Sequence, residues 1–304
     1  MVIVGHTIDG PLRGIIFSFH MPLFFIVSGA TYKYTSCFRE RLSKVRKSFK
    51  KLIVPAVVCF LVRSYMLHGI VSIRELLVSI IWGSGVDGSD FSAVGMVWFL
   101  YVMFEVRLLA DIIHNYFKHN DLIVAVFFSL LGISIAKWHW LPFSIDIALA
   151  VLVFFFGGRI LNNMHGISDK KYILLLKFGL IWAISFLFTI KVFHDNLELA
   201  SRSYPMFGII PYITAFAGTI AICIIAIIME ESCEIIKKIY NILCDFGKNS
   251  LTIFFIHYFD VILKPLWGSF GNSIIHTICR VTCDIVIYFI FQILKTKKLK
   301  VNCK

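Results

Sequence analysis

Long apolar runs recur along the whole chain of 304 residues and leave little polar sequence between them. Nine stretches are long enough to cross a bilayer, whose hydrocarbon core of about 30 Å needs about 20 apolar residues in a helix. They are Leu12 to Tyr32, Leu52 to His68, Val94 to Phe117, Leu122 to Ala136, Ser144 to Leu161, Tyr172 to Phe193, Met206 to Met229, Ser250 to Lys264 and Ser273 to Ile293. With 59% hydrophobic and 16% charged residues, the chain is neither a disordered segment nor an ordinary cytosolic enzyme. We expect an all-α polytopic membrane bundle, because the apolar blocks lack the alternation of barrel strands.

The first eight residues, MVIVGHTI, look like the end of one more span whose beginning is absent. They are too few to cross a bilayer alone, and they lack the charged start of a signal peptide. We therefore expect about nine full spans plus a truncated first span, in a single membrane domain over residues 1–304. The eight cysteines form no CxxC pair and no His/Cys cluster, which predicts reduced thiols and no structural metal.

The basic residues predict the orientation of the chain in the membrane. If the N-terminus is inside, 20 of the 30 Lys and Arg lie in inner segments, 6 lie in outer loops and 4 lie within spans. Inner loops carry such an excess, so both termini are expected in the cytoplasm and the chain in the inner (plasma) membrane. The net charge of +12 is explained by this topology and by contact with membrane lipids, and no nucleic-acid partner is expected.

The segment Lys33 to Lys51 is the most polar part of the chain and is expected to be an inner one. Two interpretations of its basic residues stay open. They either set the topology and contact anionic lipid headgroups, or they also attract an anionic cytoplasmic ligand. The glycine-rich stretch from Gly83 to Gly95 has neither a GxxxxGK[ST] nor a GxGxxG pattern, so it is not interpreted as a phosphate-binding loop.

Two histidines in adjacent predicted spans are candidate functional residues, since an ionisable side chain in a membrane costs roughly 2.5 to 3.5 kcal/mol. His6 lies at the outer end of the truncated span, and His20 lies two residues before Pro22, which favours a helix kink. Each ring is either hydrogen-bonded to a neighbouring helix or catalytic. Neither has a second ligand three or four residues away, so no metal site is expected there.

The predicted span Val94 to Phe117 also carries ionisable residues. Glu105 follows Trp98 by seven residues and lies near the same helical face, where it either binds a sugar hydroxyl, orients a histidine or pairs with a residue such as Arg107.

The last two spans carry a further group. Asp260 follows His257 by three residues and shares its helical face, whereas Arg280 and Asp284 are spaced as a structural ion pair of one helix.

Six sequence blocks follow one another along the chain in a fixed order and at particular spacings. They are MVIVGHTI, FSFHMPLFFIVSG, KKLIVPA, VWFL, VFFFGGRI and FGKNSLTIFFIHYF. Together they resemble acyltransferase family 3, especially its fucose 4-O-acetylase-like members, from residue 1 to about residue 260. The resemblance implies a ten-helix membrane enzyme that transfers acetyl from cytoplasmic acetyl-CoA to a hydroxyl of a cell-surface or lipid-linked glycan.

The resemblance also implies roles for individual residues. His6 is expected to be the general base or a transient acetyl carrier. His20 is expected to hold the acceptor or to stabilise charge on the thioester oxygen. The basic segment Lys33 to Lys51 is expected to meet the phosphates of coenzyme A. The expected substrate-binding residues are Trp98, Asn249, Ser250 and His257, to which the position of Glu105 on the helical face of Trp98 adds Glu105, with no metal ligand.

One departure from the family pattern bears on these roles. The family usually places a basic residue about ten positions before its first motif histidine, but only five residues precede His6, and Arg13 follows it. One alternative is therefore an inactive, truncated family member. Another is a transporter or flippase of polysaccharide precursors, because intramembrane charges and kinked helices also mark transport paths. Inverted repeats would favour transport, and the sequence shows none. The acceptor sugar and the oligomeric state stay open.

Overall fold

The computed structural model describes residues 2–8, 10–88, 91–162, 170–193, 196–266 and 274–302. Within these ranges the regular structure is helical, apart from one isolated antiparallel bridge between Glu198 and Ser203. The predicted all-α class is therefore confirmed.

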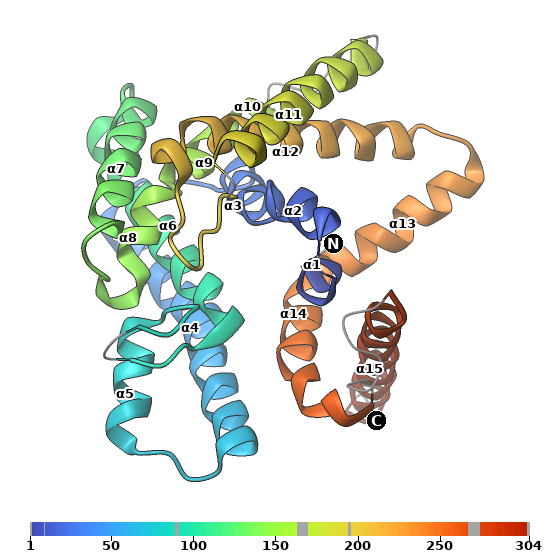
Figure 1. The fold of residues 1–304 in the computed structure, drawn as a ribbon. Coiled ribbons are helices and arrows are strands. Elements are labelled where there is room, and N and C mark those ends of the chain that lie inside the picture. The colour runs from blue at the N-terminus through green and yellow to red at the C-terminus, as the bar shows by residue number, and fades with distance from the viewer. Residues whose placement is uncertain are drawn as a thin grey trace. The chain divides into compact units, whose positions relative to one another are not determined.

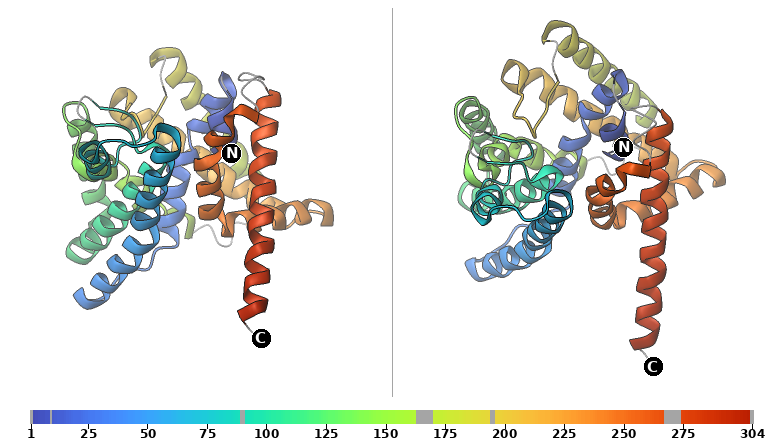
Figure 2. Two further views of the ribbon diagram at one scale, coloured as in Figure 1. Left: turned by 90° about the horizontal axis from the view of Figure 1, so that it is seen from below. Right: turned by 60° about the horizontal axis from the view of Figure 1, so that its bottom comes forward.

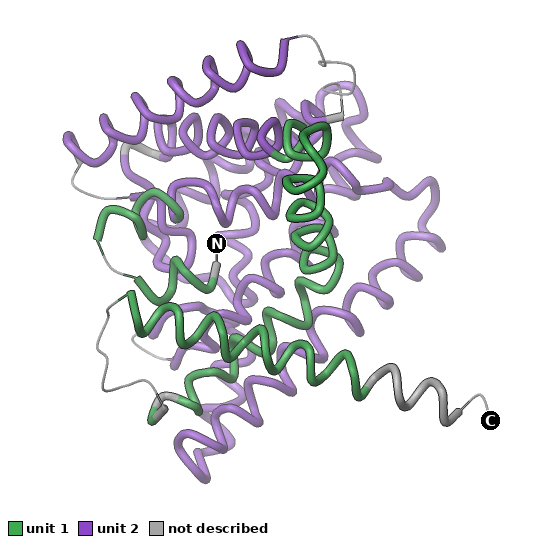
Figure 3. Tube along the Cα trace, turned by 90° about the vertical axis from the view of Figure 1, so that its right-hand side faces the viewer, with its two compact units in different colours: residues 1–16, 226–304 green, residues 17–225 purple. Residues whose placement is uncertain are grey.

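The helices form two compact units (Figure 3). Unit 1 consists of Met1–Ile16 and Ala226–Lys304, and unit 2 consists of Phe17–Ile225. The single membrane domain expected over residues 1–304 stays a prediction.

The helices are labelled in Figure 1. Those of unit 2 are α3 (His20–Ala30), α4 (Phe38–His68), α5 (Ile73–Trp82), α6 (Trp98–Phe117), α7 (Asp121–Ala136), α8 (Ile145–Ala150), α9 (Leu152–Gly157), α10 (Arg159–Asn162) and α11 (Lys171–Phe193), with short 3-10 turns η1 (Gly95–Val97), η2 (Pro142–Ser144) and η4 (Pro205–Gly208). Those of unit 1 are α1 (Val2–Thr7), α13 (Glu234–Lys248), α14 (Ser250–Phe259), η5 (Asp260–Leu266) and α15 (Ile274–Asn302). Two helices, α2 (Pro11–Phe17) and α12 (Ile209–Glu230), include residues of both units.

Five helical segments are long and apolar enough to cross a membrane: Pro11–Ala30, Phe38–His68, Lys171–Val192, Ile209–Glu230 and Ile274–Leu294. A pair bent by 49°, Pro142–Ala150 with Leu152–Leu161, makes six if it is one broken span. The apolar segments Asp121–Ala136 and Ser250–Leu263 are shorter, and α6 is long enough but carries Glu105, Arg107 and Asp111. The described residues therefore form a multispanning membrane protein, and the count of nine full spans stays a prediction.

The basic segment that was expected to be an inner connection is helical from Phe38 onward. It continues into the predicted span as one helix, α4, of 31 residues. At 1.5 Å per residue α4 is about 46 Å long, which exceeds the thickness of a hydrocarbon core. The sequence did not predict this continuity, because the change from basic to apolar composition after Lys51 is typical of the boundary between a loop and a membrane span.

The kink predicted beside His20 is present as a helix break. α2 ends at Phe17 and α3 begins at His20, and between them Phe19 has φ −144° and ψ −15°. Pro22 lies in the first turn of α3, where a backbone N–H has no partner inside the helix and proline is tolerated. The break fixes His20 as the first residue of a helix.

Two glycines allow α3 to pack closely on the segment of α9 and α10. A Cβ on Gly29 would overlap the backbone carbonyl of Phe155, and a Cβ on Gly158 would overlap the backbone of Ile26 and Ala30. Small residues at a helix crossing let backbones approach where apolar surroundings provide no hydrophobic driving force. The position of α3 in unit 2 thus depends on these two missing side chains.

Charged pairs lie at opposite ends of α7 in unit 2. Arg159 Nη2 lies 2.5 Å from Asp121 Oδ2, at the first residue of α7. Beyond the last residue of α7, Arg202 Nη1 lies 3.3 Å from the buried Asp146 Oδ2. The predicted inner position of Arg159 and the predicted outer position of Arg202 stay predictions.

Unit 1 is organised around α15. Both α14 and α1 pack against α15, and Figure 2 shows α14 and α15 side by side. The Thr277 hydroxyl on α15 donates a hydrogen bond to the Thr7 carbonyl oxygen of α1 at 3.2 Å. These contacts bring the first helix of the chain next to its last helices.

Helix α13 of unit 1 is amphipathic and has no buried residue. Its apolar side chains Ile235, Ile239, Ile242 and Leu243 are exposed and recur at a spacing of three and four residues. Such a helix is typical of one that lies in a membrane interface. The expected contact with lipids stays a prediction.

Candidate functional site

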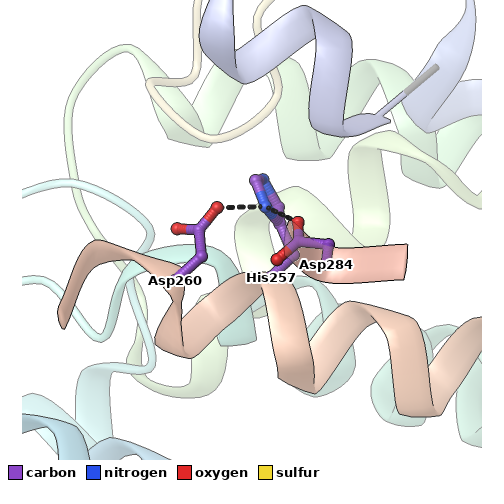
Figure 4. A group of neighbouring side chains, drawn as sticks. All are labelled: His257, Asp260 and Asp284. Carbon is purple, nitrogen blue, oxygen red and sulfur yellow. Dashed lines mark hydrogen bonds and ion pairs between the residues drawn. The ribbon is translucent and has the colours of Figure 1, made fainter. Parts of the chain in front are cut away.

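A buried cluster of one histidine and two carboxylates lies in unit 1 (Figure 4). His257 Nδ1 on α14 lies 2.7 Å from Asp260 Oδ2 at the start of η5 and 3.0 Å from Asp284 Oδ2 on α15. All three side chains are at most 2% exposed, so water does not screen their interactions. The predicted common face of His257 and Asp260 is thereby confirmed.

Arg280 completes this cluster. Its Nε lies 2.9 Å from Asp260 Oδ2, and its Nη2 lies 2.6 Å from Asp260 Oδ1. The prediction of an Arg280–Asp284 pair is therefore wrong. The guanidinium of Arg280 is bound by Asp260, at the start of η5, whereas Asp284 lies against the imidazole of His257 on α14.

His6 lies at the exposed edge of the cluster. Its ring centroid on α1 is 6.0 Å from that of His257, and the ring planes are inclined by 38°. His6 is exposed, whereas His257 is buried. Of these two rings, His6 is therefore the accessible one, and His257 is enclosed by the protein.

The donor set of the cluster also bears on metal binding. His257, Asp260 and Asp284 could each offer one ligand atom, and these atoms lie within 4.8 Å of one another. However, Arg280 already neutralises Asp260, and His257 Nδ1 is occupied by both carboxylates. This arrangement fits a proton-binding cluster better than a cation site, and the expected absence of a metal stays a prediction.

A basic pocket of about 370 Å³ lies in unit 2, between the end of α3, the first half of α4 and α6. Most of its charged side chains are cationic: Lys33, Arg41, Lys44, Lys47, Lys51 and Arg107, against the single carboxylate of Asp111. The predicted basic segment thus forms one wall of a concave site. The sequence did not predict the contribution of α6, because Arg107 and Asp111 lie inside an apolar run.

Hydrogen bonds hold the walls of this basic pocket in place. Buried Asp111 accepts hydrogen bonds from the Thr35 backbone N–H at 2.8 Å and from the Thr35 hydroxyl, and Arg41 Nε lies 2.9 Å from its Oδ2. Arg107 donates to Ser28 Oγ through Nε at 3.2 Å and through Nη2 at 3.0 Å. Since Asp111 balances only Arg41, the pocket keeps an excess of positive charge for an anionic ligand.

An aromatic and charged group lies next to this pocket. The ring of Tyr34 stacks on His114 at 3.9 Å between centroids, and His114 Nδ1 lies 2.7 Å from Asp121 Oδ2. Burial raises the pKa of Tyr34 to about 12, so this phenol stays neutral at physiological pH. The group ties the residues after α3 to α6 and α7.

A comparison with protein families places these sites in context. The family model of an acyltransferase domain, that of acyltransferase family 3, matches residues 1–294. The chain belongs to acyltransferase family 3. No curated protein and no solved structure matches it. The family predicted from the six sequence blocks is thus confirmed, and the protein is a membrane acyltransferase.

The acyltransferase has its two predicted catalytic histidines in different units. His20 begins α3 in unit 2, is 4% exposed, and lies against Phe17 at 4.6 Å between ring centroids. His6 belongs to unit 1. The predicted cooperation of the two rings stays a prediction, and the structure instead places His257 beside His6.

The predicted substrate-binding residues of α6 lie in unit 2. Trp98 is buried at the start of α6 and packs against the backbone of Gly85. Glu105 is half-buried, and within the described residues no hydrogen bond or ion pair involves it. Arg107 contacts Ser28, so the alternative of a Glu105–Arg107 pair is not observed.

The predicted residues Asn249 and Ser250 join α13 to α14 in unit 1. The Asn249 side chain donates to the Asp245 carbonyl oxygen at 3.0 Å and accepts from Gln292 Nε2 at 3.2 Å. Ser250 is exposed as the first residue of α14. Asn249 therefore stabilises the junction, and substrate binding by either residue stays a prediction. Sequence reasoning missed Asp284 as a partner of His257, and only the packing of α14 on α15 discloses it.

Proposed function

We propose that this acyltransferase is an O-acetyltransferase that moves an acetyl group from acetyl-CoA to a hydroxyl of a cell-surface or lipid-linked glycan. The observation that carries the proposal is the exposed ring of His6 in front of the buried His257 and its two carboxylates. In a member of an acyltransferase family, an accessible imidazole with this support is suited to act as a general base.

The reaction needs one proton to move twice. His6 removes the proton of the acceptor hydroxyl while its oxygen attacks the thioester carbonyl, and the tetrahedral intermediate then expels coenzyme A thiolate. The same proton passes from His6 to the thiolate sulfur, so the products are the acetyl ester and free coenzyme A thiol. A positioned base of this kind contributes about 10² to 10⁴-fold to the rate. A transient acetyl group on His6 is the alternative route.

The basic pocket supports the choice of donor. Coenzyme A carries several phosphate charges, and Arg and Lys side chains bind phosphate through charge-assisted hydrogen bonds. The cationic side chains of α4 and Arg107 of α6 supply such groups in one concave site. The predicted inner location of α4 would place this pocket on the cytoplasmic side of the plasma membrane, where acetyl-CoA is found.

Residues of α6 support the choice of acceptor. Glu105 has no partner among the described residues, and a carboxylate accepts hydrogen bonds from sugar hydroxyls. We assign the glycan to Glu105 on this basis, and the expected role of Trp98 stays a prediction.

The test uses the full chain in lipid vesicles with radiolabelled acetyl-CoA and a set of cell-surface glycans. Wild-type protein is expected to transfer label to a glycan and to release coenzyme A thiol, and His6→Ala is expected to reduce transfer at least 100-fold. His119→Ala is the matched control, because this histidine is exposed between α6 and α7. Full transfer by His6→Ala would remove His6 from the mechanism, and the lack of transfer by wild-type protein to any acceptor would refute the proposed function.

A further inference from the structure

His257 uses only one of its two ring nitrogens within the described residues. Nδ1 faces both carboxylates, so Nδ1 carries the hydrogen and donates it. Nε2 is buried and has no hydrogen-bond partner. In the neutral ring Nε2 therefore holds a lone pair, on the side away from the carboxylates. A buried acceptor without a donor is costly, which points to a group that reaches it during function.

The charged groups around His257 carry a net charge of −1 when both imidazoles are neutral. Asp260 follows it in the chain, Asp284 and Arg280 face it from α15, and His6 faces it from α1. With both imidazoles neutral, two carboxylates and one guanidinium leave one negative charge. Arg13, the other cation close to His6, belongs to α2 and is exposed. One additional proton, held by either His6 or His257, would bring the net charge of the buried cluster to zero.

We propose that His257, Asp260 and Asp284 are positioning residues that receive, through His6, the proton that His6 takes from the acceptor. The inference rests on the proposed role of His6 as the base. His6 accepts the hydroxyl proton on its outer nitrogen and passes the proton of its inner nitrogen to His257 Nε2. When the thiolate leaves, both transfers reverse, and no proton is lost or gained.

The relay requires the two neighbouring rings to approach each other. The two ring centroids are 6.0 Å apart, and α1 is held to α15 by the Thr277–Thr7 hydrogen bond. Catalytic hydrogen bonds are often long in a free enzyme and shorten once substrate binds. Two carboxylates behind His257 then stabilise the charge that develops, as one carboxylate does behind the histidine of a serine protease.

The first test measures coupling between the rings without any acetyl transfer. Protein labelled with ¹⁵N-histidine in lipid nanodiscs is compared with Asp284→Asn, and the signals are assigned by their loss in His6→Gln and His257→Gln. The relay predicts that Asp284→Asn shifts the ring signals of both His257 and His6. Asp245→Asn, an exposed aspartate on α13, is the matched control and is expected to shift neither. An unchanged His6 spectrum in Asp284→Asn overturns the relay.

The second test measures steady-state kinetics of the same variants. Asp284→Asn is expected to lower kcat by about 10- to 100-fold and to leave KM for donor and acceptor unchanged, because the relay acts only in the transition state. Asp284→Glu is expected to recover part of kcat. The double variant with His6→Ala is expected to be no slower than His6→Ala alone. Wild-type kcat in Asp284→Asn overturns the relay.

The two tests distinguish the relay from the proposed function. If the ring signals are coupled but wild-type protein transfers no acetyl group, the coupling of the two histidines is supported and the proposed function is refuted.

Discussion

Arg280 on α15 donates hydrogen bonds to both carboxylate oxygens of Asp260, at 2.6 Å and 2.9 Å, although its own helix carries Asp284 one turn away. A bidentate pair of this kind is geometrically specific, since the planar guanidinium matches the carboxylate. It fixes η5 on α15 and thereby holds Asp260 beside His257. The pair is almost fully removed from water on the carboxylate side, where Asp260 is 1% exposed.

Loss of Arg280 is therefore expected to destabilise unit 1. Arg280→Met leaves a buried carboxylate without its partner, which costs about 3–5 kcal/mol for buried pairs. The double variant Arg280→Met with Asp260→Asn removes the uncompensated charge and is expected to recover much of this loss. Thermal unfolding of the purified protein in detergent measures both. Equal melting temperatures for Arg280→Met and wild type would contradict a structural role for the pair.

Gly29 provides a test of the packing of α3 in unit 2. Gly29→Ala is expected to reduce the yield of folded protein strongly, because its Cβ would overlap the Phe155 carbonyl, and overpacking in a rigid contact costs about 1–3 kcal/mol or more. Gly179→Ala on α11 is the matched control, since no atom lies within 4 Å of its added Cβ. In a helix interior this second change is expected to be neutral or to stabilise by up to about 1 kcal/mol.

Size-exclusion chromatography of both glycine variants, followed by thermal unfolding, measures the difference. A Gly29→Ala protein as stable as Gly179→Ala would show that α3 and α9 can separate without cost, which the backbone contact argues against.

The sequence predicted those features of the site that depend on spacing within one helix. His257 and Asp260 share a face because a separation of three residues places them there. The same rule failed for Arg280 and Asp284, because Arg280 binds Asp260 of η5 and Asp284 binds His257 of α14. Such competition leaves no trace in the sequence of one helix.

The approach of His6 to His257 depends on the docking of the first helix on the last one. Sequence periodicity cannot relate His6 to His257, because they are far apart in the chain. Only the resemblance to the family assigned both residues to one site. For a similar reason, the sequence predicted the α4 side of the basic pocket but not its α6 side. The charges of α4 are visible as a run, but Arg107 and Asp111 look like isolated residues of an apolar span until α6 packs on α4.

The basic pocket predicts how donor affinity responds to charge. In the double variant Lys44→Met with Lys47→Met, KM for acetyl-CoA is expected to rise about tenfold, because each partly exposed charge contributes about 0.5–1 kcal/mol and 1.4 kcal/mol is tenfold in affinity. KM for the acceptor is expected to stay constant. Lys237→Met on α13, an exposed lysine outside the pocket, is the control. A rise of both KM values alike would indicate damage to the fold and would contradict a donor-specific pocket.

The orientation in the membrane can be tested with single cysteines. Cys37 is exposed between α3 and α4, on the predicted inner side, and Ser201 is exposed in the predicted outer connection before α12. In a background with the other cysteines replaced, a membrane-impermeant maleimide is expected to label Ser201→Cys in intact cells and Cys37 only after the membrane is opened. The reason is that the excess of Lys and Arg around Cys37 keeps this segment in the cytoplasm. Labelling of Cys37 in intact cells would reverse the orientation, and the basic pocket would then face away from cytoplasmic acetyl-CoA.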